Sequence, residues 1–240
     1  MVFFLSPDRE VFLFDLDAIK IHSLNFQMQS PERYCQAVSD VLTLHKTGRV
    51  NIIGHSFGTI TAGWFVRAHP EAVCHMTLID PVSLLLAHPE VAYNFLYRPP
   101  ATVVQWFMYI FASREITIAN ALRRNFWWYR NELWLEDVHP SIGVHVSLAG
   151  GDEVCNSRTV REYVELCVGR RQEMVKETSA ACPAADITMC YRPGHSHAQI
   201  LLCLASLQQL RVSVLGSQHR TEKQWEHALG DSIIGPLDDE

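Results

Sequence analysis

Residues 50–59 of this 240-residue chain read VNIIGHSFGT, and this stretch decides the fold. A short β-branched, apolar run enters the pentapeptide at 54–58 (GHSFG), and a helix-compatible segment at 60–69 follows it. On such a sharp strand-to-helix turn, a serine is held with its hydroxyl exposed above the sheet. The turn is tight enough to predict that only glycine fits on either side of it. Ser56 is therefore the candidate nucleophile, and the backbone N–H of Phe57 is the candidate oxyanion donor.

The composition is typical of one globular domain without a charged partner. Apolar residues make up 48% of the chain, charged residues 19%, and the net charge is −6. The absence of basic clusters argues against nucleic-acid binding and against an electrostatic membrane anchor. The longest apolar stretch, 101–112, has about half the length that a bilayer span needs, so no transmembrane span is expected.

The cysteines and the N-terminus predict an intracellular, cytoplasmic protein. The seven cysteines are odd in number and scattered, without a Cys-x-x-Cys pair, which favours reduced thiols over a disulfide framework or a zinc site. The apolar run at the N-terminus is too short for a signal peptide and soon reaches Pro7 and Asp8.

Strand-like and helical patterns alternate along most of the chain. The segment Val11–Leu16 (VFLFDL) is predicted to be a buried strand, and the helix after it to begin with Ser30 as N-cap and Pro31 in its first turn. Further strands are predicted at 50–53, 73–79, 144–148 and 187–191. Such alternation predicts a mainly parallel sheet flanked by helices, with its chemistry at the carboxyl ends of the strands.

One segment interrupts this alternation. From about 83 to 140 the patterns are helical and rich in large aromatic side chains. An insertion between two strands lies naturally over the carboxyl end of the sheet, so we expect a helical cap there. Residues 1–215 are predicted to form a single domain that includes this cap, and 216–240 a polar, loosely ordered tail.

An acid and two histidines follow Ser56 at the ends of later predicted strands. Asp152 stands at the tip of a glycine turn, and His195 and His197 lie between the last strand and the last helix. A serine hydroxyl needs a base, and that base needs an orienting carboxylate. Asp80 also ends a strand, but an aspartate directly before a proline is more often a turn former. Asp152 is therefore the preferred acid.

With these residues the chain resembles the α/β-hydrolase fold superfamily, over about residues 11–210. The resemblance implies Ser56 as nucleophile, Asp152 as triad acid and a histidine at 195 or 197 as base, in the chain order of that fold. His197 is preferred because His-Ala-Gln-Ile-Leu is similar to the start of the final helix in such proteins. His195 directly follows a glycine, another common arrangement, and remains the alternative base.

The resemblance also implies strands that this sequence does not supply. About three strands would precede Val11, and the third would carry the His-Gly loop that provides a second oxyanion N–H. Only ten residues precede Val11, and no His-Gly-Gly pattern occurs before Ser56. The resemblance is thus to an N-terminally incomplete hydrolase that lacks the usual first strands. A fragment or incomplete gene model, a natural truncation with a rearranged sheet, and an inactive relative are the open explanations, the first being preferred.

The function predicted from these residues is that of a serine hydrolase, esterase- or lipase-like, acting on an ester or related acyl bond through an acyl-enzyme. No cofactor is implied, and His195-x-His197 lacks companion residues for a metal site. The aromatic cap suggests a lipophilic small-molecule substrate, although the same side chains equally suit an ordinary core. The alternative is a catalytically impaired or truncated hydrolase-fold protein that acts as a binding or interaction module.

Overall fold

The structure is a computed structural model that describes residues 10–19, 27–177, 185–208, 210–212 and 215–216. Its centre is a four-stranded sheet in the order β1-β2-β3-β4, with every neighbouring pair parallel. The strands are β1 (Val50–His55), β2 (Val73–Ile79), β3 (Gly143–Gly151) and β4 (Ile187–Ser196). The predicted parallel sheet is thereby confirmed.

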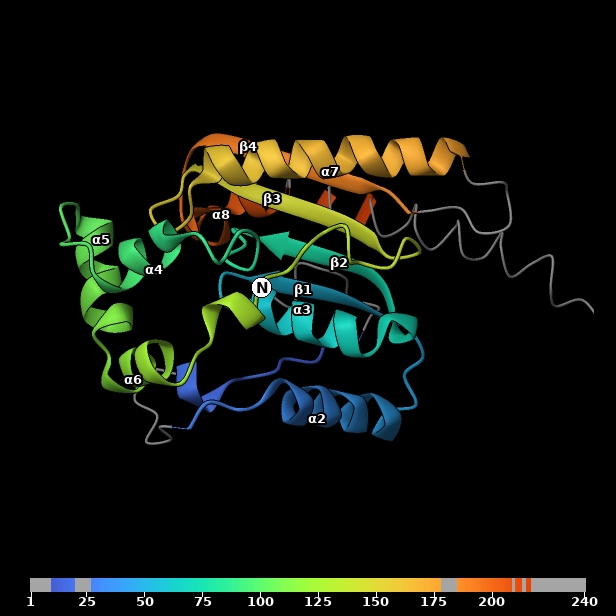
Figure 1. Ribbon diagram of the computed structural model, residues 1–240, viewed down its shortest axis with the longest axis horizontal. Coiled ribbons are helices and arrows are strands. Elements are labelled where there is room, and N and C mark those ends of the chain that lie inside the picture. The colour runs from blue at the N-terminus through green and yellow to red at the C-terminus, as the bar shows by residue number, and fades with distance from the viewer. Residues whose placement is uncertain (1–9, 20–26, 178–184, 209, 213–214, 217–240) are drawn as a thin grey trace, which may run out of the picture.

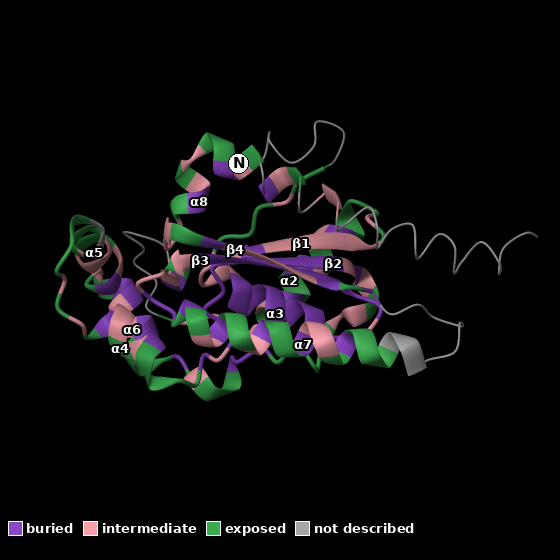
Figure 2. Cartoon of the chain, turned by 90° about the horizontal axis from the view of Figure 1, so that it is seen from above, coloured by how far each residue is buried: buried purple, intermediate pink, exposed green. Residues whose placement is uncertain are grey.

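Helices flank this sheet on both faces, as Figure 2 shows. On one face, α3 (Gly58–Ala68) packs against β1 and α7 (Ser157–Glu177) against β3 and β4. On the other face lies α8 (Gln199–Leu202), which ends at Cys203 before helical structure resumes at 204–208. The helix α2 (Pro31–Leu44) packs on α3 and not on the sheet (Figure 1). Two short 3-10 turns complete this part of the chain, η1 (Asp17–Ile19) and η2 (Pro70–Ala72).

The start of α2 is determined by local side-chain chemistry. Ser30 has extended backbone, and its hydroxyl accepts the N–H of Arg33 at 3.3 Å. Pro31 then fills the first helical position, where its missing N–H costs nothing because that group would have no partner in the helix. Ser30 is thus the N-cap that the sequence predicts. The side of the helix toward the core buries Cys35, Val38 and Leu42.

The chain leaves the sheet between β2 and β3 to form a group of short helices. These are α4 (Pro89–Leu96), α5 (Val103–Met108), the π-helical turn η3 (Tyr109–Ser113), α6 (Ile116–Arg124) and the 3-10 turn η4 (Trp128–Arg130). Figure 1 shows them beyond the carboxyl ends of the strands, and we call this group the cap. The division into a domain at 1–215 and a tail at 216–240 stays a prediction, since 217–240 lie outside the described residues. Within the described residues, every helix is too short or too polar to cross a lipid bilayer.

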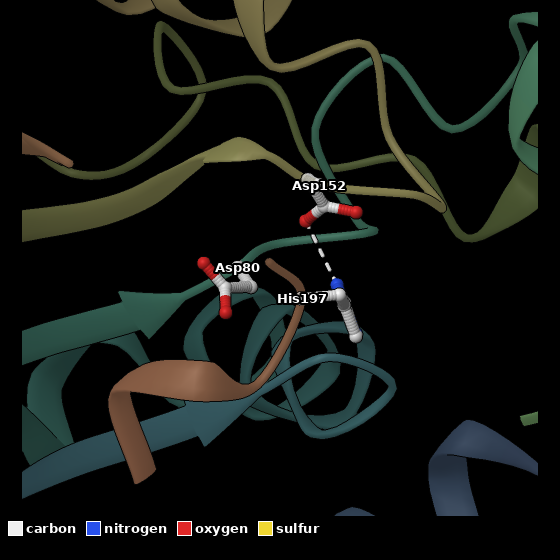
Figure 3. A group of neighbouring side chains, drawn as sticks. All are labelled: Asp80, Asp152 and His197. Carbon is white, nitrogen blue, oxygen red and sulfur yellow. Dashed lines mark hydrogen bonds and ion pairs between the residues drawn. The ribbon is translucent and has the colours of Figure 1, made fainter. Parts of the chain in front are cut away.

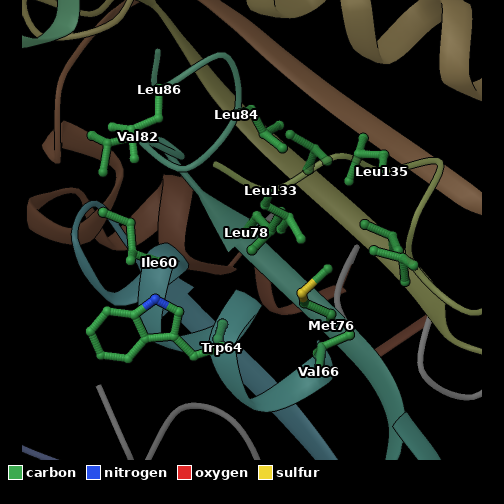
Figure 4. Packing of buried hydrophobic residues seen from close by; sticks show 14 of the residues in the cluster. Ile60, Trp64, Val66, Met76, Leu78, Val82, Leu84, Leu86, Leu133 and Leu135 are labelled. Carbon is green, nitrogen blue, oxygen red and sulfur yellow. The ribbon is translucent and has the colours of Figure 1, made fainter. Parts of the chain in front are cut away.

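The main core lies between α3 and the sheet (Figure 4). Met76 and Leu78 of β2 are fully buried, as is Leu135 in the segment before β3. Burying a side chain of this size stabilises the fold by about 1.5–3 kcal/mol. The indole of Trp64 lies in the same core, and its N–H donates to Asn131 Oδ1 at 2.6 Å. That bond removes the penalty for burying a polar group.

One predicted strand is wrong. Val11–Leu16 has neither helical nor strand structure, and Leu13 is 80% exposed. Phe12 instead contacts the ring of His45 and Phe14 that of Tyr34, with centroids 4.8 and 6.3 Å apart. An apolar run becomes a strand only where a neighbouring strand pairs with it. No such pairing exists in the described part of the chain, so the run packs through its aromatic rings.

The same segment borders a cavity of about 740 Å³. Its walls come from residues 10–14, from α2, from α3 and from residues 50–53 of β1. Among the described residues, β1 pairs only with β2, so the outer edge of β1 carries no further strand. This edge is where the resemblance would place the third of the strands expected before Val11.

Candidate active site

Ser56 occupies a strained turn between β1 and α3. Its φ is 51°, in the left-handed region that side-chain-bearing residues avoid. Such a conformation costs about 1–3 kcal/mol and persists where surrounding bonds enforce it. Here the Ser56 N–H donates to the Ile79 carbonyl at 3.0 Å, and the Ser56 carbonyl accepts the Thr59 N–H at 3.0 Å. The turn is thus tied to β2 and to the first turn of α3.

The glycines on the two sides of Ser56 differ in how much space surrounds them. A Cβ at Gly54 would lie 2.6 Å from the carbonyl oxygen of Gly58, a backbone atom that cannot easily move. A Cβ at Gly58 would meet nothing within 4 Å. The prediction that only glycine fits is therefore correct at 54 and wrong at 58. The reason is that Gly58 borders the cavity beside β1.

Thr59 ties the same turn to the entrance of the cap. Its fully buried hydroxyl donates to the Ser56 carbonyl at 2.6 Å and accepts the N–H of Ser83 at 3.2 Å. A buried hydroxyl that both donates and accepts a hydrogen bond stabilises the fold, because these bonds replace those it would make with water. The sequence does not single out this residue, because a threonine in the first turn of a helix is common.

Three of the predicted site residues meet in a chain of short hydrogen bonds. His197 Nδ1 lies 2.8 Å from Asp152 Oδ2, a contact drawn in Figure 3, and His197 Nε2 lies 2.9 Å from Ser56 Oγ. An ionised carboxylate only accepts, so Nδ1 carries the hydrogen and donates it to Asp152. Nε2 is then the acceptor for the Ser56 hydroxyl, as a general base must be. Only 8% of the His197 side chain and 3% of the Asp152 side chain are exposed.

The Asp152 carboxylate is held by the turn that follows β3. Its other oxygen, Oδ1, accepts the backbone N–H groups of Val154 at 2.7 Å and Cys155 at 3.0 Å. The turn can approach β4 because residue 150 is glycine, where a Cβ would lie 2.5 Å from Pro193 Cα. The glycine turn that predicts Asp152 from the sequence therefore also brings the ends of β3 and β4 together.

The two alternative residues lie elsewhere. The ring of His195 is 3.4 Å from Ser206 Oγ, and within the described residues its Nδ1 is buried without a partner. Asp80 lies near Asp152 and His197 but uses both oxygens on backbone N–H groups, those of Ala149 and Ala198. The structure therefore brings Asp152 and His197 to Ser56, and neither alternative.

Asp80, Asp152 and His197 also form a compact group in which one ligand atom of each lies within 4.8 Å of the others. The donor chemistry does not favour a metal ion, because a ring nitrogen that carries a hydrogen has no lone pair to offer and each Asp80 oxygen is already held by a backbone N–H. His197 Nδ1 carries the hydrogen bonded to Asp152, and both oxygens of Asp80 already accept hydrogen bonds. The group is instead a hydrogen-bonded cluster of two carboxylates around one imidazole.

Comparison with known proteins agrees with this architecture. The alpha/beta hydrolase fold family matches residues 30–135. BpoC of Mycobacterium tuberculosis H37Rv, named as a candidate non-heme bromoperoxidase, superposes with a TM-score of 0.54 at 11% identity, over 85% of this chain and 80% of its own. MGS-MChE2, an alpha/beta hydrolase enzyme from the metagenome of lagoon sediments at Mar Chica, Morocco, gives 0.52 at 11% identity, over 87% and 77%. The chain therefore has the α/β-hydrolase fold.

A third solved structure, a bacterial membrane phospholipase A, gives a TM-score of 0.52 at 13% identity, over 82% of this chain and 66% of its own. At such identities a likeness shows the fold alone. No curated protein matches this chain by sequence.

The charge around the imidazole of His197 favours its protonated form. Burial lowers the pKa of His197, but the hydrogen bond and charge of Asp152, with the charges of Asp80 and Glu153, outweigh burial and raise the pKa above its ordinary value. His55 differs, because burial and the nearby His197 lower its pKa to about 4. Its ring lies 5.5 Å from that of His197. His55 is therefore a neutral neighbour of His197.

Phe57 connects the turn to the cap. Its N–H has no acceptor among the described residues and stands at the N-terminus of α3, where the helix dipole favours negative charge. Its ring lies 5.5 Å from that of Phe126, which lies 5.1 Å from Trp128. An N–H suited to an oxyanion is therefore flanked by aromatic side chains of the cap.

Proposed function

We propose that this protein is a serine hydrolase that cleaves an ester or related acyl bond through an acyl-enzyme. The observation that carries this proposal is the hydrogen-bond chain from Ser56 through His197 to Asp152, with distances of 2.9 and 2.8 Å. Both contacts lie within the range expected between a nucleophile, its base and the group that orients the base. The superfamily supplies the scaffold but does not by itself assign the activity.

In the first half of the reaction, Ser56 Oγ bonds to the acyl carbon while its proton passes to His197 Nε2. Asp152 accepts the Nδ1 hydrogen throughout and stabilises the imidazolium that forms. The acyl oxygen, which gains a negative charge, accepts a hydrogen bond from the Phe57 N–H. The bond to the leaving alcohol then breaks, and His197 returns the proton to that alcohol. Water, deprotonated by the same histidine, attacks the acyl-enzyme and releases the acid and Ser56.

We further propose a lipophilic substrate. The contact of Phe57 with Phe126, extended by Trp128, places apolar rings next to the nucleophile turn. Binding pockets lined by aromatic side chains favour apolar groups. We expect p-nitrophenyl esters with acyl chains of six or more carbons to give higher kcat/KM values than the acetate ester. A preference for acetate would contradict this part of the proposal.

The thiols support the intracellular, cytoplasmic location inferred from the sequence. All six cysteines of the described residues are free, and three of them are buried. Burial raises the pKa of Cys155 well above its ordinary value, so that this thiol stays protonated. Free thiols in such number are usual in a reducing compartment.

The decisive experiment is labelling of the purified protein with a fluorophosphonate probe, followed by peptide mapping. We expect modification at Ser56 and none in Ser56→Ala. Circular dichroism and a cooperative thermal transition must first show that both proteins are folded. A folded wild-type protein that does not react with the probe would falsify the proposal.

The alternative, a binding or interaction module on an inactive hydrolase scaffold, has one observation in its favour. The outer edge of β1 lacks a paired strand in the described part of the chain, and no His-Gly pair precedes Ser56 to supply a second oxyanion donor. Loss of one such donor costs about 10²–10³ in turnover. Labelling at Ser56 combined with undetectable ester hydrolysis would favour this alternative.

A further inference from the structure

We propose that Asp80 is a positioning residue for the reaction proposed above. It anchors the loop that carries His197 to the end of the sheet and supplies a second negative charge to the imidazolium. This inference rests on the proposed function, because it assigns a role within that site.

Asp80 connects three strand ends through one carboxylate. It directly follows β2, and its Oδ1 accepts the N–H of Ala149 in β3 at 2.9 Å. Its Oδ2 accepts the N–H of Ala198, the residue after His197, at 2.8 Å. Hydrogen bonds to an ionised acceptor are about twice as strong as neutral ones. The histidine loop is thus fastened to β2 and β3 at the residue next to the base, and Figure 3 shows this aspartate beside His197.

Backbone conformation shows that this anchor holds a strained segment. Ala198 has a φ of 62°, a region that alanine avoids. Its short side chain offers no hydrogen bond to offset the strain, whereas its N–H is bound by Asp80. Asp80 itself has a φ of 44°, and its N–H donates to the Ser147 carbonyl at 2.9 Å. Aspartate and asparagine tolerate this region better than other side chains do.

The second role of Asp80 is electrostatic. Only 2% of the residue is exposed, so its charge is poorly screened. The charged or titratable groups that face His197 are Asp152 and Glu153 after β3, Asp80 after β2, and His55 of β1. Glu153 also accepts a hydrogen bond from the backbone N–H of His197, at 3.1 Å. Burial raises the pKa of Asp80, while the charge of His197 and the two backbone N–H groups oppose that shift.

Asp80→Asn is the variant that tests both roles of Asp80 while keeping a side chain that suits its backbone conformation. Asparagine suits the left-handed backbone and keeps one acceptor oxygen, but it loses the charge and one of the two anchoring bonds. We expect kcat for ester hydrolysis to fall by about 10- to 100-fold, the range for removing a group that orients another, while KM changes by less than about threefold. The acid limb of the pH–rate profile moves to lower pH because a charge that favours the imidazolium is lost. Asp137→Asn, at an exposed turn remote from the site, is the matched control and leaves both quantities unchanged.

A second measurement does not depend on activity. The imidazole of His197 is titrated by NMR in ¹⁵N-histidine-labelled protein, with His197→Gln to assign its signals. We expect its pKa to be lower in Asp80→Asn than in the wild type. An unchanged pKa together with an unchanged kcat would overturn the role of Asp80, whatever the probe does at Ser56. A wild type that resists the probe while the His197 pKa still shifts would instead refute the hydrolase function and leave the electrostatic role of Asp80 standing.

Discussion

The two edges of β1 are built differently. Along its inner edge, β1 pairs with β2 in parallel from Val50 opposite Val73 to His55 opposite Ile79. Along its outer edge, no strand of the described residues pairs with it, and residues 10–14 lie beside a cavity of about 740 Å³. One strand thus carries the nucleophile turn between a fully paired side and an open side.

This difference separates two parts of the proposed chemistry. Every carboxylate that touches or positions His197 comes from the inner side, from the ends of β2 and β3. In this fold the second oxyanion donor comes from a strand that precedes the nucleophile turn. We therefore expect proton transfer to depend on residues that are in place, and oxyanion stabilisation to depend on Phe57. Four predictions sharpen or break this contrast.

The largest expected effect is that of the inner-side base. His197→Ala removes the acceptor for the Ser56 proton, and labelling by a fluorophosphonate should slow by about 10³-fold or more. His195→Ala is the matched control, because His195 contacts Ser206 and not Ser56. Its labelling rate should stay within about threefold of the wild type, by the small effects usual for residues outside the site. Equal losses in both variants would break the assignment of the base.

The second prediction compares two apolar side chains, one on each side of β1. Met76 is fully buried in β2, and Met76→Ala should lower the free energy of unfolding by about 2–5 kcal/mol. Leu13 is 80% exposed beside the outer edge, and Leu13→Ala should change the free energy of unfolding by less than about 0.5 kcal/mol. Urea denaturation followed by circular dichroism measures both. A loss above about 1 kcal/mol for Leu13→Ala would mean that the outer edge is covered in solution, since exposed truncations cost less than that.

The third prediction concerns the two glycines of the turn. Gly54→Ala should destabilise the protein by about 1–3 kcal/mol, as overpacking does, because its Cβ would meet the Gly58 carbonyl. It should also slow labelling of Ser56, since the turn must shift to accommodate the methyl group. Gly58→Ala adds a methyl group toward open space, and its stability should stay within about 1 kcal/mol of the wild type. Thermal melts and labelling rates of the two variants test this, and similar damage from both would contradict the contrast.

On the inner side of β1, the structure brings together the three side chains that the sequence singles out, Ser56, Asp152 and His197. The glycine turn at 54–58, the acid at 152 and the histidine at 197 each follow a strand, and the carboxyl ends of parallel strands meet at one edge. Such local patterns determine which strands and helices form and which residues stand at their ends. The parallel sheet and the start of α2 at Pro31 are predicted for the same reason.

The outer side could not be predicted in this way. The apolar run at 11–16 reads as a strand, yet strand formation depends on a partner that a local pattern does not contain. The space at Gly58 and the double hydrogen bond of Asp80 likewise depend on chain segments distant in sequence. An aspartate before Pro81 reads as a turn former, and only the fold shows that it reaches Ala198. These long-range contacts determine the remainder of the site.

The smallest expected effect is the pH dependence, which isolates the inner side. His197 acts as a base only when neutral, and its pKa is raised above the ordinary value of 6.5 by Asp152, Asp80 and Glu153 against the effect of burial. The rate of Ser56 acylation should therefore fall as the pH drops, with the midpoint of the acid limb above 6.5. One pH unit below that midpoint the rate should be about tenfold lower than the plateau.

His55 should not contribute to this limb, because its pKa is about 4 and it stays neutral throughout. Stopped-flow measurement of p-nitrophenol release between pH 5 and 9 gives the profile, and His55→Gln is the control that should leave the midpoint in place. Asp152→Asn should move the midpoint down, because it removes the charge of Asp152 and weakens its hydrogen bond, and these two do most to raise the pKa of His197. A midpoint below 6.5 in the wild type would mean that burial outweighs the carboxylates. The inner side would then orient the histidine without making it more basic, and the contrast between the two edges of β1 would be one of geometry alone.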